Sequence, residues 1–194
     1  MDSLQAERFH EITKTKYFQK VYDAVLQARA ERFRVKVNTV VMRGINDDEI
    51  MDFVKFSADH DVEVRFLELM KIGCSNQNHG LNFVPAQKII KKIEESEVLL
   101  PQSINRDATS FNFTALSGAR LGFIASESQA FCSFCSRLRL TVAEKLRACI
   151  MSDAGLSLRG VKKELYPEIL KTVLKTKPLT RIDHIEQPMY QIGG

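Results

Sequence analysis

A strand, a helix and a second strand follow one another over short connections early in the chain, and this order restricts the fold more than any other feature. Residues 33–42 are rich in β-branched side chains that alternate with polar ones, as in a strand. Residues 62–69 predict a second strand. Ile50, Phe53 and Val54 recur between them at helical spacing. Two strands joined through a helix lie parallel in one sheet. The order therefore predicts an α/β fold.

Two further signals mark the ends of these elements. Residues 17–32 predict an amphipathic helix ahead of the first strand. Asn46 is expected to cap the helix between the strands, because an asparagine there precedes three acidic residues that favour a helix N-terminus.

The pattern changes after Met70. The expected elements are a loop over residues 71–82, a short helix opening at Pro85, one β-hairpin from residues 111–117 and 121–125, a second hairpin from residues 137–142 and 146–150, and helical spacing from Leu165 to Leu174. A boundary near residues 71–84 would thus separate an α/β region from an α+β region.

The 194 residues suffice for one or two domains with a buried core. No apolar run approaches the length of a membrane span, and the N-terminus has no signal-peptide pattern, so we expect a cytoplasmic protein that is not bound to a membrane. The net charge of +4 is too small to indicate a nucleic-acid-binding protein.

Three cysteines form the most informative chemical pattern, a Cys132-x-x-Cys135 pair followed by Cys149. Thiols stay reduced in the cytoplasm, so such a group predicts a metal site in preference to disulfides. Three thiolates would leave one coordination position of a metal open to water or substrate.

Arginines accompany these cysteines. On a regular hairpin, Cys135, Arg137 and Arg139 would share one face, and Arg147 would share one with Cys149. Guanidinium groups bind phosphate in a bidentate manner, so the pattern predicts an anion site beside the metal site.

Other interpretations of the cysteines stay open from spacing alone. Two half-buried thiols and an unrelated third would also give this pattern. Zinc would normally require a fourth ligand, and the nearest later histidine, His184, has no companion at ligand spacing. Iron–sulfur and zinc therefore both remain possible at this point.

Several motifs together resemble one family, the radical S-adenosylmethionine GTP 3′,8-cyclases of molybdenum cofactor biosynthesis (the molybdenum cofactor biosynthesis protein A family). They are the cysteine segment 131–149, the terminal residues 189–194 with their double glycine, and upstream segments 2–4, 36–40, 43–49 and 64–70, which fall in the family's order and spacing.

The resemblance implies roles for particular residues. Cys132, Cys135 and Cys149 would hold a 4Fe–4S cluster whose unligated iron contacts the GTP base. Met70 would contact S-adenosylmethionine. The tail residues Gly193 and Gly194 would reach the active site. The implied GTP contacts are Lys36, Arg65, Arg137, Leu138, Arg139 and Arg147. Strand alternation agrees for two of these, since Lys36 and Arg65 should face away from Val37 and Val64.

The resemblance also implies the architecture. Residues 1–75 would form part of an incomplete TIM-like parallel α/β barrel, and residues 76–194 an α+β domain whose hairpins carry the iron–sulfur site and bind GTP. The family's Cys-x3-Cys-x2-Cys motif is absent, since Cys74 alone precedes Cys132. We therefore expect S-adenosylmethionine and a second 4Fe–4S cluster only together with a missing N-terminal half, and no radical generation by this chain alone.

Three hypotheses follow. The first is the C-terminal part of a GTP 3′,8-cyclase, a lyase, with GTP, a separately encoded N-terminal half and a second copy of the chain as partners, and with neither nucleic acid nor membrane. The second is a standalone iron–sulfur or nucleotide-binding module without catalysis. The third is a zinc-stabilised structural or nucleic-acid-binding domain. The ordered motif set favours the first, because a zinc domain would not need it.

Overall fold

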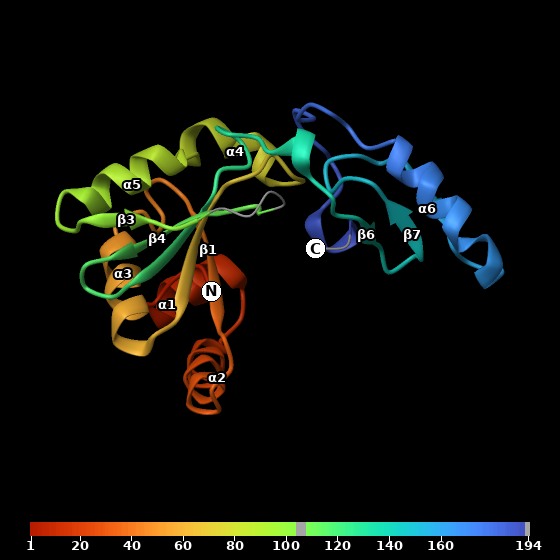
Figure 1. The fold of residues 1–194 in the computed structure, drawn as a ribbon. Helices are drawn as coiled ribbons and strands as arrows, with labels where there is room; N and C mark the ends of the chain where they lie inside the picture. Colours follow the sequence, from red (N-terminus) through yellow and green to blue (C-terminus); the bar gives the residue numbers. More distant parts are fainter. Residues whose placement is uncertain (104–107, 193–194) are drawn as a thin grey trace. The chain divides into compact units, whose positions relative to one another are not determined.

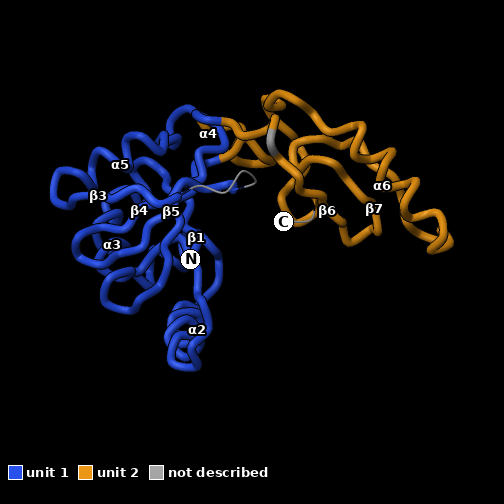
Figure 2. The backbone as a smooth tube through the Cα atoms, viewed as in Figure 1, with its two compact units in different colours: residues 1–69, 80–129 blue, residues 70–79, 130–194 orange. Residues whose placement is uncertain are grey.

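The structure is a computed structural model that describes residues 1–103 and 108–192. The chain divides into two compact units, drawn in blue and orange in Figure 2. Unit 1 comprises residues 1–69 and 80–129, and unit 2 comprises residues 70–79 and 130–194. This division differs from the expected one at residue 75, because residues 80–129 pack with the N-terminal region.

Unit 1 is built on one mixed five-stranded sheet in the order β1-β2-β5-β4-β3. Its strands are β1 (Lys36–Val41), β2 (Glu63–Glu68), β3 (Leu99–Pro101), β4 (Phe111–Ala115) and β5 (Arg120–Ile124). Strands β1, β2 and β5 are parallel, whereas β3 and β4 add in antiparallel fashion. The predicted α/β class and the β4–β5 hairpin are confirmed. The hairpin joins the first sheet, however, and does not belong to a separate α+β domain.

The helices of unit 1 are α1 (Ala6–Thr13), α2 (Phe18–Ala30), α3 (Ile50–His60) and α5 (Ala86–Glu94). Helices α3 and α5 pack against the sheet (Figure 1). The buried face of α3 carries Ile50, Phe53 and Val54, as its spacing predicts. An aromatic stack continues this core, with ring centroids of Phe66 and Phe111 each 5.7 Å from that of Phe123. Apolar burial thus covers one face of the sheet.

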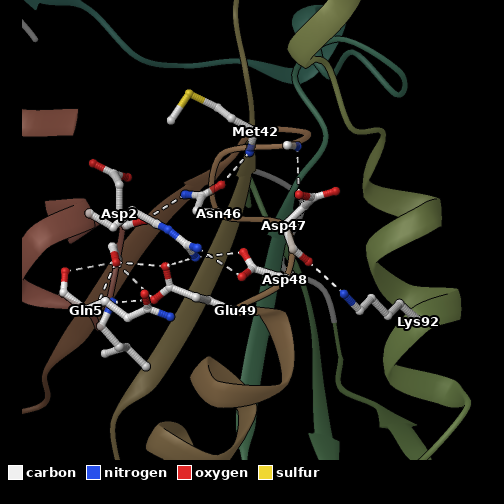
Figure 3. Close-up of polar contacts among 12 residues, drawn as sticks. Asp2, Gln5, Met42, Asn46, Asp47, Asp48, Glu49 and Lys92 are labelled. Carbon is white, nitrogen blue, oxygen red and sulfur yellow. Dashed lines mark hydrogen bonds and ion pairs between the residues drawn. The ribbon is translucent and has the colours of Figure 1, made fainter. Parts of the chain in front are cut away.

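A buried polar network fixes the N-terminal segment to the sheet (Figure 3). Glu49 is fully buried and accepts hydrogen bonds from the hydroxyl of Ser3 at 2.8 Å, the backbone N–H of Leu4 at 2.7 Å and the guanidinium of Arg8 at 2.6 Å. Because each carboxylate oxygen accepts from a charged or polar donor, the cost of burying the carboxylate is offset.

The expected cap by Asn46 was wrong, because α3 begins after Glu49 and has no side-chain cap. The side-chain oxygen of Asn46 instead accepts a hydrogen bond from the N–H of Met42, and its side-chain nitrogen donates to the carbonyls of Asp2 and Val40 (Figure 3). Its side chain therefore joins the end of β1 to the N-terminal segment.

Unit 2 contains short elements. These are η1 (Cys132–Phe134), β6 (Arg139–Leu140), β7 (Lys145–Arg147), β8 (Gly155–Ser157), η2 (Lys163–Leu165), α6 (Tyr166–Lys175) and η3 (Met189–Gln191), with α4 (Ser75–Asn82) at the boundary between the units. Strands β6, β7 and β8 form an antiparallel sheet. The predicted second hairpin is confirmed in shorter form, whereas the loop expected over residues 71–82 contains α4. No helix in the described ranges is long and apolar enough to cross a membrane.

Candidate functional site

The open face of the unit 1 sheet carries polar side chains. Along β1 and β2 the residues alternate, so that Val37 and Val64 are buried in the core and Lys36 and Arg65 lie on the opposite face. The predicted orientation of Lys36 and Arg65 is therefore confirmed. Lys36 pairs in register with Glu63, and Arg65 lies two residues beyond Glu63 on the same strand.

Glu63 connects these two cations, which the sequence did not predict. One carboxylate oxygen lies 3.2 Å from Nζ of Lys36, and the other accepts a hydrogen bond from Nε of Arg65 at 2.7 Å. Burial opposes ionisation of Glu63, but the hydrogen bonds from Arg65 and Lys36 outweigh it and hold its pKa below the usual value. The sequence signal that could have identified Glu63 is its position two residues before Arg65, because residues two apart on a strand share one face.

The same face continues onto β5 and β4. Gly122 pairs with Arg65 on one side and with Asn112 on the other. A Cβ on Gly122 would lie 2.8 Å from Oδ1 of Asn112 and 3.1 Å from Cγ of Arg65. Gly122 thus leaves the space that both side chains occupy. Oδ1 of Asn112 is buried and has no hydrogen-bond partner among the described residues.

The three cysteines of interest lie in unit 2 as free, half-buried thiols. Cys132 begins the single turn η1 and Cys135 follows it, and the N–H of Cys135 donates to the carbonyl of Cys132 at 3.2 Å. Cys149 follows β7, and its sulfur accepts the N–H of Met151 at 3.4 Å. A tight turn and a strand end therefore position the predicted metal ligands.

Two of these thiols have pKa values shifted in opposite directions. Burial and the nearby thiolates of Cys149 and Cys135 raise the pKa of Cys132. Burial also opposes ionisation of Cys135, but hydrogen bonds from the backbone and side chain of Arg137, with the charge of Lys177, outweigh it and lower the pKa. Cys135 is therefore easier to ionise than Cys132.

This donor set suits a thiophilic metal, since three neighbouring thiols beside cationic groups are the ligands that iron–sulfur clusters and zinc take. Within residues 1–103 and 108–192, however, no three histidine, cysteine or acidic side chains converge as a preformed ligand set. The assignment of Cys132, Cys135 and Cys149 as metal ligands therefore stays a prediction.

The predicted arginines occupy different environments. Arg137 is exposed, with its guanidinium carbon 4.8 Å from the ring centroid of Phe131. Arg139 is half-buried and pairs in register with Arg147 across the hairpin. Leu138 packs against the apolar cluster formed by Leu146, Ala148 and Val173. The structure thus brings Arg137 beside Cys135. The strand expected to align Cys135, Arg137 and Arg139 covers only Arg139–Leu140, so a shared strand face does not position them.

Arg147 is only 1% exposed and bonds inside unit 2. Its Nε donates to the carbonyl of Ser152 at 2.6 Å, and Nη1 donates to the side chain of Gln187 at 2.9 Å. The guanidinium therefore joins the turn after Cys149 to the C-terminal segment, and the geometry gives Arg147 a structural role.

Three sequence-predicted features meet in one apolar cluster of unit 2. Its buried members are Ile72, Met151, Ile185 and Ile192. Met70, the predicted S-adenosylmethionine contact, and Cys149 both pack against it. Gly193 and Gly194 lie outside the described residues, but the preceding Ile192 is fully buried. The cluster therefore anchors the start of the predicted tail close to Cys149 and Met70.

Comparison with known proteins identifies the family. Residues 62–184 match the family described as Molybdenum Cofactor Synthesis C. The chain belongs to this family. Over its full length it is 38% identical to a GTP 3′,8-cyclase of Synechocystis sp., covering 59% of that protein. It is 36% identical to the enzyme of that name from Syntrophomonas wolfei and 35% identical to the one from Moorella thermoacetica, covering 64% of each.

The resemblance stated from the motifs is thereby confirmed, and the chain spans about three fifths of the length of these relatives. The match to Molybdenum Cofactor Synthesis C includes Glu63, Arg65, Met70 and the cysteine segment, whereas Lys36 lies before its first residue. The relatives extend the likeness to the whole chain, including β1 and the N-terminal network.

Proposed function

We propose that this chain is the GTP-binding, cluster-bearing part of a GTP 3′,8-cyclase, a lyase that converts GTP to (8S)-3′,8-cyclo-7,8-dihydroguanosine 5′-triphosphate in molybdenum cofactor biosynthesis. The observation that carries the proposal is the apolar cluster of unit 2, which holds Cys149, Met70 and the residue before the double glycine together. The names and sequence identity of the relatives support the reaction.

Cys132, Cys135 and Cys149 would hold a 4Fe–4S cluster. When bound, the cluster would supply an open iron that binds the guanine base as a Lewis acid. The part of this chain is to orient the ligands: η1 fixes two thiols, and the apolar cluster fixes the third beside the tail. Arg137, which bonds Cys135, would add positive charge where the anionic substrate binds.

The remaining residues would bind and orient substrates. Lys36 and Arg65 are proposed as contacts to GTP phosphates, because they are the cations that Glu63 holds on the open sheet face. Arg139 is proposed as a further GTP contact. Leu138 and Arg147 would support that contact by packing and by holding the turn after Cys149. Met70 would contact S-adenosylmethionine, and Gly193 and Gly194 would extend toward the substrate.

The complete reaction would require further parts. A polypeptide with a Cys-x3-Cys-x2-Cys motif would bind S-adenosylmethionine on a second 4Fe–4S cluster and start the radical reaction. We propose that this chain does not start it alone, because Cys74 is its one cysteine beyond the three proposed ligands.

Metal analysis after anaerobic reconstitution tests the proposal. We expect about four iron and four sulfide per chain in the wild type, and loss of both in Cys149→Ser. Cys74→Ser is the matched control, because Cys74 is exposed and should leave the metal content unchanged. Stoichiometric zinc without sulfide would instead support a zinc-stabilised domain and contradict the cyclase assignment.

A further inference from the structure

On the open face of the unit 1 sheet, one carboxylate lies between two cations that belong to different strands. Glu63 is 21% exposed, as is Arg65, whereas the Lys36 side chain is 46% exposed. The ion pair with Lys36 crosses from β2 to β1, and the hydrogen bond with Arg65 runs along β2. Both positive charges are therefore already paired before any ligand binds.

The surroundings of Glu63 form a small basic pocket. It has a volume of 250 Å³ and is lined by Arg34, Val35, Lys36, Glu63 and Arg120. Three of these five residues are cations, and Glu63 is the one carboxylate among them. Arg65 does not line this pocket, and Arg120 pairs with Asp61 at 2.8 Å, so Lys36 is the cation that the pocket shares with the ion pairs of Glu63.

We propose that Glu63 is a specificity-determining counter-charge of a polyphosphate site. In the free protein its carboxylate pairs with Lys36 and Arg65, and phosphate oxygens displace it from both cations on binding. The inference rests on the proposed function, since it takes Lys36 and Arg65 as phosphate contacts. Whereas those two cations attract phosphate, the negatively charged Glu63 would lower the affinity for it.

The expected consequence is selection by ligand charge. A ligand that displaces Glu63 gains more the further its negative charge exceeds that of the carboxylate, and a triphosphate carries more negative charge than a monophosphate. Glu63 stays ionised at neutral pH, because Arg65 and Lys36 offset its burial. The competition therefore operates under ordinary conditions and disfavours single phosphate groups.

Calorimetric titration of the full chain with inorganic tripolyphosphate, GTP and guanosine tests this role. In Glu63→Gln the amide oxygen still accepts from Arg65, but the competing charge is gone. We expect tripolyphosphate and GTP each to bind about tenfold more tightly than to the wild type, and guanosine to be unaffected. Glu63→Ala, which removes the group altogether, should shift both affinities in the same direction.

The matched control is Asp59→Asn. Asp59 carries the same charge in the same unit, but it pairs with Lys55 on the surface of α3 at 2.6 Å. Its replacement should change tripolyphosphate affinity by less than about twofold, because exposed charges are strongly screened. An equal gain in Asp59→Asn would attribute the effect to net charge and overturn the proposal.

The outcomes separate this inference from the proposed function. Unchanged tripolyphosphate affinity in Glu63→Gln and Glu63→Ala would overturn the counter-charge, and weaker binding would show instead that Glu63 positions the cations. In a further outcome, both variants gain affinity for tripolyphosphate, but neither they nor the wild type bind GTP more tightly than tripolyphosphate. The role of Glu63 as a counter-charge then stands, and the proposed GTP site fails. A wild-type protein that binds neither ligand would contradict both.

Discussion

The two units place polar groups in contrasting ways. In unit 1, Lys36, Glu63 and Arg65 project from adjacent parallel strands whose other face is covered by a large apolar core. In unit 2 the strands have two or three residues each, and two small apolar clusters support the cysteines and arginines. Unit 1 is therefore stabilised mainly by apolar burial, whereas unit 2 depends more on individual polar contacts and, on our proposal, on a bound cluster.

The largest effect on this contrast should come from Phe123→Ala. Phe123 is fully buried and stacks with Phe66 and Phe111, so its loss should destabilise unit 1 by about 3–5 kcal/mol. Denaturant unfolding followed by circular dichroism measures the change. Reaction of Cys132 and Cys135 with a thiol reagent should be unaltered, and a parallel rise in thiol reactivity would show that the units unfold together.

A smaller loss is expected from Glu68→Gln. Glu68 is 2% exposed and accepts hydrogen bonds from the N–H groups of Ala86, Glu127 and Ser128, each at 2.8 Å. An amide would turn an NH₂ group toward these donors and cost about 2–3 kcal/mol. The exposed Glu94→Gln in α5 is the control, and equal unfolding curves for the two variants would refute the role of Glu68.

Arg147→Lys tests the polar contacts of unit 2. Lysine cannot reach both Ser152 and Gln187 as the guanidinium does, so we expect a loss of about 1–3 kcal/mol. Hydrogen exchange of residues 148–153 should rise. Arg159→Lys, at an exposed site, should leave exchange unchanged; if Arg147→Lys also leaves it unchanged, the turn does not depend on Arg147.

The smallest effect concerns acid stability. The side-chain hydrogen bond from Arg8 lowers the pKa of Asp48, although burial opposes this. A carboxyl whose folded pKa is lowered contributes stability above its unfolded pKa and loses it as the pH falls through the folded value. Asp48→Asn should therefore reduce stability at neutral pH and leave it unchanged at strongly acidic pH. A difference that persists below the folded pKa would contradict the pairing.

Local patterns were predictable because local spacing decides them. The burial of Ile50, Phe53 and Val54 follows from helical periodicity, and the outward orientation of Lys36 and Arg65 follows from strand alternation. The hairpin at Phe111–Ala115 and Arg120–Ile124 was also predicted, since a turn joins neighbouring strands.

Long-range contacts were not predictable in the same way. The pairing of β5 with β2 depends on residues far apart in the chain, so its hairpin was assigned to the wrong region. Asn46 has the residue type of a helix cap, but tertiary contacts with Asp2 and Val40 take its amide. The burial of Arg147 depends on Gln187, forty residues away, and spacing within the hairpin does not reveal it.

GTP titration of the anaerobically reconstituted chain tests the central claim most directly. We expect that wild-type protein binds GTP, that Arg137→Ala and Cys149→Ser each weaken binding by about tenfold or more, and that Arg159→Ala and Cys74→Ser do not. Equal GTP affinity in all five proteins would contradict a GTP site at the three cysteines and their arginines.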